Sequence, residues 1–276
     1  MVKFFRTTVT RTIKSLALTL MSGFICVSAL ADTTPSDSTN LITPFEAVYY
    51  AYKWDDNLGS AKISLEELSE GLYSLTYQSK VSKFFLSDKR FEHSIFMVEG
   101  DHLVPQQYNY SRTGTGPDKS LKVEFPGDDG GQIQINKDDE AYSLPWQGEL
   151  DNQLYRLDAP IRLSRGVENL SYDFINYRGQ QRHYGMRVLG KETVDLPYGK
   201  IEAIKVEIVR ESKSRYTLAW FAPDLNYQLV RLQQFKDGDE QGDMSGEFRL
   251  IGSSLTDFAV DAQGTRIGQE NWLDAR

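Results

Sequence analysis

Apolar and polar residues alternate with a period of two over much of the chain from Phe45 onward. The alternation is clearest in residues Phe45–Tyr50, around Ile133 and Ile135, and in Ile201–Arg210, where Glu202, Ile204, Val206 and Ile208 share one face. The segment Leu72–Tyr77 is rich in aromatic and other strand-favouring residues. Such patterns are typical of antiparallel strands that bury one face and leave the other in water.

Turn residues separate these strands at short intervals. Glycine supplies the positive φ that tight hairpins need, and Asp and Asn tolerate it. The predicted turns lie at residues 56–59, 70–71, 99–101, 126–131 and 197–199. Many short strands at this spacing predict a mainly β fold, namely a curved antiparallel sheet in the form of a half-barrel, open barrel or sandwich.

One short helix is predicted in the middle of the chain, from Asp151 to Ala159. Asp151 is a suitable N-cap, and Leu150 is placed to pack against Tyr155. Pro160 lacks an amide hydrogen, so we expect the helix to end before it. Three apolar residues then lie near one stripe of the helix: Leu154, Leu157 and Ile161.

The first thirty residues predict export. The positively charged residues Lys3, Arg6, Arg11 and Lys14 precede an apolar run from Ser15 to Leu30. The run ends in Ala29-Leu30-Ala31, a small-x-small pattern that predicts cleavage between Ala31 and Asp32. The alternative is an uncleaved anchor, but about twenty apolar residues are needed to span a bilayer and this run is shorter. We therefore expect residues 1–31 to be a signal peptide and the protein to be periplasmic, in a Gram-negative bacterium, without a permanent membrane span.

The remaining chain is predicted to form one domain. Residues 32–43 are small and polar and predict a flexible tether. Residues 44–252 carry the strand pattern, and residues 253–276 have mixed polarity and predict a weakly structured extension. The single cysteine, Cys26, lies in the predicted leader, which leaves the exported part without disulfides or a thiol nucleophile. We expect a monomer.

The net charge and the spacing of histidines and acidic residues exclude several classes of partner and site. The chain carries a net charge of −8, so without the four positive charges of the leader it carries −12, which argues against nucleic acid and anionic membrane surfaces as partners. The three histidines, His93, His102 and His183, lack metal-ligand spacing. The acidic segment Asp237–Asp243 departs from a calcium-binding loop at its fifth and twelfth positions, Gln241 and Phe248. We predict no catalytic, metal-binding or cofactor-binding residues.

A second pattern, distinct from the strand alternation, lies in the C-terminal half of the chain. The motif begins at Glu192 and continues through Pro197-Tyr198-Gly199 to a strand with Ala203 and Lys205-Val206. It is followed by Trp220-Phe221-Ala222-Pro223-Asp224. With Phe45, Ala47, Tyr49, Gly59, Tyr73 and Pro105 upstream, this motif resembles an exported bacterial family, the domain of unknown function 3108. The resemblance covers about residues 44–252. It implies an exported, curved antiparallel sheet in which Glu192, Pro197, Gly199, Trp220, Ala222 and Asp224 are structural, and it implies no activity.

Three functions remain open. The first is a non-enzymatic binding or carrier module for a lipid or another hydrophobic or envelope-derived ligand, favoured by the aromatic content and the lack of catalytic motifs. The second is an assembly factor that binds an envelope protein through a sheet edge or an apolar patch. The third is a glycan hydrolase, which needs two carboxylates that converge in a groove.

Overall fold

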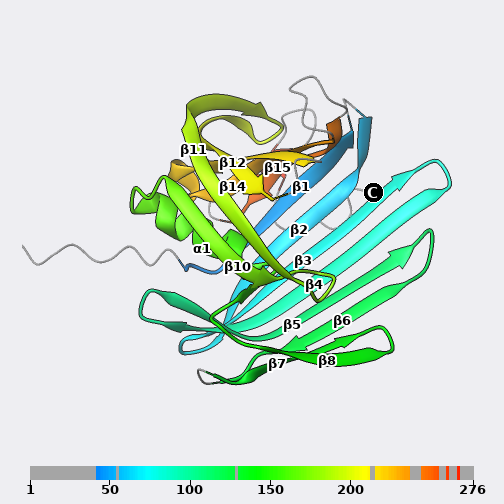
Figure 1. Cartoon of the computed structure of the whole chain (residues 1–276). Coiled ribbons are helices and arrows are strands. Elements are labelled where there is room, and N and C mark those ends of the chain that lie inside the picture. Colours follow the sequence, from blue (N-terminus) through cyan, green and yellow to red (C-terminus); the bar gives the residue numbers. More distant parts are fainter. Residues whose placement is uncertain are drawn as a thin grey trace, which may run out of the picture. The chain divides into compact units, whose positions relative to one another are not determined.

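A computed structural model describes residues 42–53, 56–127, 130–211, 215–236, 244–254, 259–260 and 266–267. Within them, fifteen strands form one sheet in the order β8-β7-β6-β5-β4-β3-β2-β1-β15-β14-β13-β12-β11-β10-β9. Neighbouring strands are antiparallel, except for the parallel pair β9 and β10. The prediction of a mainly β, curved antiparallel sheet with one short helix is therefore confirmed (Figure 1). The strands are β1 (Phe45–Lys53), β2 (Asp56–Ser69), β3 (Leu72–Lys83), β4 (Leu86–Glu99), β5 (His102–Gly114), β6 (Lys119–Glu124), β7 (Gln132–Lys137), β8 (Glu140–Pro145), β9 (Leu150–Asp151), β10 (Asn169–Ile175), β11 (Gln181–Leu196), β12 (Gly199–Arg210), β13 (Arg215–Ala222), β14 (Gln228–Lys236) and β15 (Met244–Ser253).

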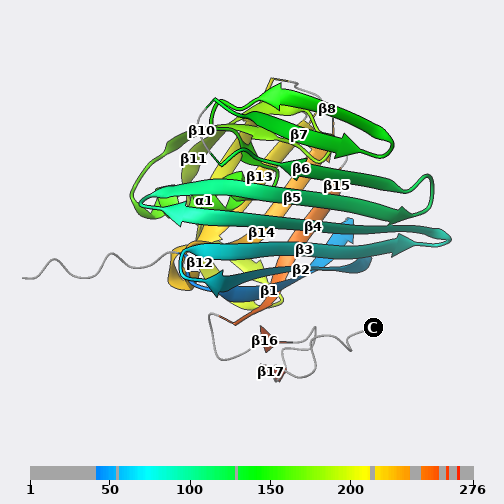
Figure 2. The ribbon, with the colours of Figure 1, turned by 90° about the horizontal axis from the view of Figure 1, so that it is seen from below.

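The first and last strands of the sheet, β1 and β15, are neighbours in its middle. The chain runs outward from β1 to the edge strand β8, continues to β9 at the other edge, passes through the helix α1 (Leu154–Ser164), and returns from β10 to β15. β15 then pairs with β1, where Ala51 lies opposite Phe248. The sheet therefore has two arms, β1–β8 and β9–β15, which are joined along the β1–β15 ladder (Figures 1 and 2). Strands β16 (Ala259–Val260) and β17 (Arg266–Ile267) form a separate pair within the predicted C-terminal extension.

The helix α1 packs against both arms. Its residues Leu154, Leu157 and Ile161 lie in a core cluster with Leu65, Leu75 and Phe96 of the first arm. Its residues Tyr155, Ala159 and Leu163 lie in another cluster with Phe174, Met186 and Val206 of the second arm. We call the face of the sheet that carries α1 the inner face, and the opposite face the outer face.

The prediction that α1 ends before Pro160 is wrong. The helix continues to Ser164 with Pro160 inside it. Pro160 has no amide hydrogen to donate to the carbonyl of Arg156, but Ile161 and Leu163 in the next turn are buried. Burial of these two side chains outweighs the loss of one hydrogen bond. The N-cap position is Gln153 and not Asp151, but the Oδ1 of Asp151 accepts hydrogen bonds from the amides of Gln153 and Leu154 at the helix start.

β12 buries residues on both of its faces. Ile204, Val206 and Ile208 belong to the cluster that contains α1, whereas Ile201 and Ala203 belong to a cluster with Trp220. The prediction of one buried face in Ile201–Arg210 therefore holds for only part of the strand. The second cluster also joins the end of the β11–β12 hairpin to β1 and β15, and the Tyr198 amide donates a hydrogen bond to the Leu250 carbonyl over 3.2 Å.

Candidate functional site

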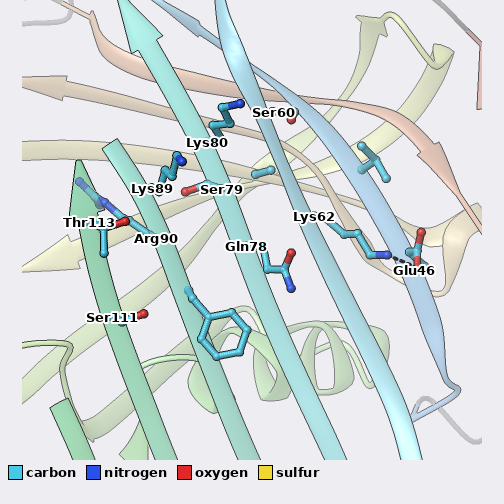
Figure 3. Close-up of a pocket in the computed structure, with 13 residues that line it drawn as sticks. Glu46, Ser60, Lys62, Gln78, Ser79, Lys80, Lys89, Arg90, Ser111 and Thr113 are labelled. Carbon is cyan, nitrogen blue, oxygen red and sulfur yellow. Dashed lines mark ion pairs between the residues drawn. The ribbon is translucent and has the colours of Figure 1, made fainter. Parts of the chain in front are cut away.

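A groove of about 470 Å³ lies along β1–β5 on the outer face. The strand register explains its lining. Ile63, Tyr77 and Glu92 stand opposite one another on the inner face, so their neighbours Lys62, Gln78 and Phe91 point outward. Figure 3 shows Lys62 and Gln78 rising from neighbouring strands, with α1 behind the sheet. The groove is lined by Glu46, Val48, Ser60, Ala61, Lys62, Gln78, Ser79, Lys80, Lys89, Arg90, Phe91, Ser111 and Thr113.

Three lysines give this groove a positive charge. Lys62 forms an ion pair with Glu46, with Nζ 2.5 Å from Oε2. Lys80 and Lys89 lie directly opposite each other on β3 and β4, and neither has a carboxylate partner among the described residues. Like charges at directly opposite positions destabilise a sheet. An anion bound between them would remove this repulsion.

The inner face carries a buried polar cluster beneath the start of α1. Glu92 accepts hydrogen bonds from the hydroxyl of Tyr108 at 2.7 Å and from Nδ2 of Asn152 at 2.6 Å. The side-chain amide of Gln153 donates to the Leu75 carbonyl and to the Ser94 hydroxyl, both at 3.0 Å. These bonds attach the residues just before α1 to β3 and β4, and β4 to β5. The cluster therefore has a structural role.

Two carboxylates, Glu92 and Asp151, belong to this cluster, which bears on the hydrolase hypothesis. Burial raises the pKa of Asp151 to about 7, against the lowering effect of the hydrogen bonds from the Leu154 and Gln153 amides. However, both carboxylates are buried and accept hydrogen bonds from protein groups. A hydrolase needs its two carboxylates in a groove that admits substrate. The cluster therefore gives the hydrolase hypothesis no support.

The residues of the C-terminal motif lie close together. Nε1 of Trp220 donates a hydrogen bond to Oε1 of Glu192 over 2.6 Å, and Nζ of Lys205 lies 3.4 Å from the other oxygen of Glu192. Lys205 and Arg231 also contact the Trp220 ring, at 5.3 and 5.0 Å from its centroid. Trp220 is buried, so its indole needs this partner.

The other motif residues shape the chain around this contact. Pro197 and Tyr198 form the turn between β11 and β12, and Gly199 follows with a φ of +130°. Ala222 is fully buried at the end of β13. Asp224 lies in the short 3₁₀ helix η1 (Pro223–Leu225) that leads to β14. These positions are consistent with structural roles.

Among the remaining sequence candidates, the structure describes the three histidines but not the acidic segment or the predicted cleavage residues. The three histidines do not cluster, and among the residues that the structure describes no group of three or more His, Cys, Asp and Glu side chains is placed to hold a metal. His93 shares a hydrogen bond with the Ser74 hydroxyl at 3.0 Å. The acidic segment 237–243 and the predicted cleavage residues Ala29, Ala31 and Asp32 lie outside the described residues. The described part of the chain has no helix with the length and hydrophobicity needed to cross a membrane.

Sequence reasoning missed the lysine groove. Lys80 and Lys89 are nine positions apart, and their opposite placement depends on the register of the β3–β4 hairpin. That register is set by the two-residue turn Phe84-Phe85, which lacks the Gly, Asn or Asp by which such turns are recognised. Counting outward from that turn would have placed the two lysines opposite each other.

Comparison with known proteins gives a family and a fold. The family model described as "Protein of unknown function (DUF3108)" matches residues 47–245. No curated protein matches the chain. A crystal structure of a β-barrel-like protein of the domain of unknown function DUF1849 from Brucella abortus has a TM-score of 0.53 at 10% identity, over 78% of this chain and 98% of that one. The immune modulator A of Aeromonas veronii covers 70% of this chain and 72% of its own at 5% identity, but its TM-score of 0.18 does not indicate a shared fold.

Proposed function

We propose that this chain, which belongs to the DUF3108 family of proteins of unknown function, is an exported, non-enzymatic binding module of the periplasm. We infer that its ligand is an anionic glycan or glycolipid head group of the cell envelope, bound in the groove of Lys62, Lys80 and Lys89. The observation that carries this proposal is that Lys80 and Lys89 occupy directly opposite positions on β3 and β4, with no carboxylate partner among the described residues.

The lining of the groove suits a charged sugar. The lysine ammonium groups attract phosphate or carboxylate, while the hydroxyl groups of Ser111 and Thr113 and the amide of Gln78 exchange hydrogen bonds with sugar hydroxyls. Phe91 adds an apolar surface in the same groove. A site with a few charged groups and several neutral donors and acceptors gives both affinity and orientation.

The outer face is favoured over the inner face for this ligand. The hypothesis of an acyl-chain carrier places the ligand on the concave, inner side of the sheet. There, α1 and the side chains of two core clusters cover much of β2–β5 and β10–β13. The outer groove is polar and positively charged, so it suits a head group better than an acyl chain.

The substitution Lys89→Glu tests the proposal. It replaces the repulsion from Lys80 by an attraction, so we expect the free energy of unfolding to rise by about 0.5 kcal/mol. The same change places a negative charge in the groove, and we expect the affinity for purified lipopolysaccharide to fall at least tenfold. Urea unfolding measures the first effect and titration calorimetry the second.

Two comparisons make the test specific. Dephosphorylated lipopolysaccharide should bind the unchanged protein more weakly, because the groove is proposed to bind the anionic groups. The double variant Lys191→Glu and Lys200→Glu changes two lysines on β11 and β12, outside the groove, and should bind as the unchanged protein does. Equal binding by the Lys89→Glu variant and the unchanged protein would exclude the groove as the site.

A further inference from the structure

The turn between β3 and β4 exposes two phenylalanines to solvent. Phe84 and Phe85 are 92% and 90% exposed, and the next residue, Leu86, is 49% exposed. Figure 2 shows the β3–β4 hairpin projecting beyond the ends of β1 and β2. We call Phe84, Phe85 and Leu86 the hairpin tip. Three large apolar side chains are therefore presented to water at the end of a projecting hairpin.

The backbone of the hairpin tip is also strained. Lys83 pairs with Leu86, so the turn consists of Phe84 and Phe85 alone. Phe84 has a φ of +54°, a conformation that bulky residues rarely adopt and for which glycine is preferred at the first position of such a turn. Neither the exposure nor the strain stabilises the isolated protein. This combination is expected where the side chains contact a partner.

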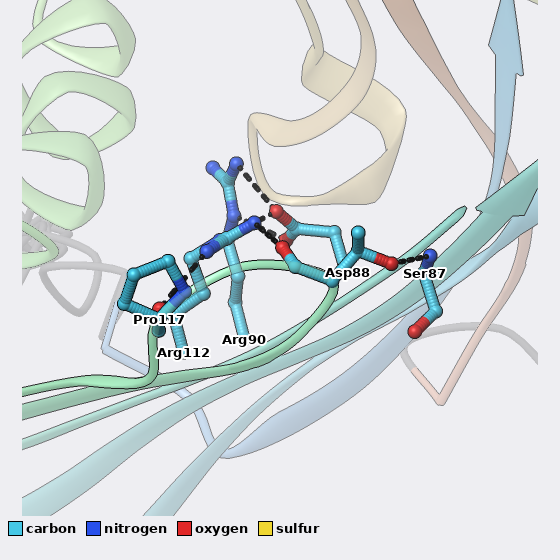
Figure 4. A network of polar contacts seen from close by, with 6 residues as sticks. Ser87, Asp88, Arg90, Arg112 and Pro117 are labelled. Atoms are coloured by element: carbon cyan, nitrogen blue, oxygen red, sulfur yellow. Dashed lines mark hydrogen bonds and ion pairs between the residues drawn. The ribbon is translucent and has the colours of Figure 1, made fainter.

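Lysines lie behind the hairpin tip on β3 and β4. Lys83 immediately precedes it, and Lys80 and Lys89 lie on the two strands behind it. The nearby carboxylates already have partners. Asp56 pairs with Lys83 at 3.1 Å, and Asp88 accepts hydrogen bonds from Arg90 at 2.7 Å and Arg112 at 2.8 Å (Figure 4). The hairpin therefore combines an apolar end with positive charge behind it.

We propose that the hairpin tip docks the protein onto an anionic lipid bilayer, with Phe84, Phe85 and Leu86 in the head-group region and the lysines above it. Aromatic side chains are favoured at the membrane interface, and each lysine near the surface adds attraction to anionic lipids. Because the lysines behind the tip are positively charged, an anionic bilayer is favoured over an uncharged one. The negative net charge predicted no affinity for anionic membranes, but a projecting tip brings its local charge to the membrane first.

This docking does not depend on the proposed ligand of the groove. It shares Lys80 and Lys89 with the groove, but it depends on Phe84, Phe85 and Leu86, which do not line the groove, and it requires only lipid. Vesicles that contain no glycolipid therefore test the docking, in which the tip variant isolates the contribution of Phe84 and Phe85, and soluble glycan tests the groove. A negative result in one of these tests does not exclude the other proposal.

The test is flotation of the processed protein with vesicles of phosphatidylethanolamine and phosphatidylglycerol. We expect the unchanged protein to float with these vesicles, and to float less at high salt and with vesicles of phosphatidylcholine alone. The double variant Phe84→Gly and Phe85→Ser places the preferred residues in the turn, so it should fold at least as stably. Its partition onto the anionic vesicles should fall by at least tenfold.

A matched control separates the hairpin tip from general hydrophobicity. Leu189 on β11 and Val209 on β12 are each 45% exposed, and the double variant Leu189→Ser and Val209→Ser should float as the unchanged protein does. The proposal is overturned if the unchanged protein does not float or if both double variants float equally. It is also overturned if the tip variant loses only self-association in analytical ultracentrifugation, because the tip would then bind a second copy.

Discussion

At the scale of single residues, the structure assigns an unusual titration to Asp151. The carboxyl is fully buried, one oxygen accepts a hydrogen bond from the first residue of α1, and the other lacks a hydrogen-bond partner. Burial raises its pKa to about 7, against about 3.9 in an unfolded chain. The folded state then binds more protons between these two values. The stabilisation from this group is complete below about pH 4 and is lost as the pH rises through 7.

The substitution Asp151→Asn tests this assignment. Asparagine keeps the oxygen that accepts hydrogen bonds at the helix start but does not titrate. We expect the free energy of unfolding of the variant, relative to the unchanged protein, to increase by roughly 2–3 kcal/mol between pH 5 and pH 8. Urea titrations at the two pH values measure the difference, in which the effects of other acids cancel. A difference that does not depend on pH would contradict the raised pKa.

At the scale of elements, the contact between Glu192 of β11 and Trp220 of β13 should hold the β11–β12 hairpin to its neighbour. Trp220 is 1% exposed, and Glu192 Oε1 accepts its indole hydrogen. The substitution Glu192→Ala leaves a buried donor without a partner, so we expect a loss of about 1–3 kcal/mol in unfolding free energy. Glu192→Gln keeps an acceptor and should lose less. Equal losses of stability in the two variants would show that the negative charge of Glu192, and not its hydrogen bond, stabilises the fold.

The elements also show how far sequence predicts the fold. Alternation identified the strands because a half-buried antiparallel sheet imposes a period of two. The alternation could not show where a β-bulge shifts the strand register. Val188 and Val194 have the same parity, yet Val188 pairs with Val206 and Val194 with Ile201, on the opposite face, because a β-bulge lies after Val188. The groove depends in the same way on the register of β3 and β4, which the sequence of the Phe84-Phe85 turn does not reveal.

At the scale of the whole molecule, α1 links the two arms of the sheet. Leu154 is fully buried against the first arm, and its neighbour Tyr155 packs within 4.3 Å of the Phe174 ring of the second, measured between ring centroids. The sequence predicted this helix but not its partners, because contacts between distant strands follow from the curl of the sheet. If α1 unites the arms, the described domain should unfold as one cooperative unit.

The substitution Leu154→Ala tests this cooperativity. It leaves a cavity where α1 meets the first arm, and we expect a loss of about 2–5 kcal/mol in unfolding free energy. Because both arms pack on α1, fluorescence and circular dichroism should report the same shifted transition. The matched substitution Leu68→Ala, on an exposed leucine of β2, should change stability by less than about 0.5 kcal/mol. Two separate transitions in the Leu154→Ala variant would show that the arms fold independently, and that α1 belongs to only one of them.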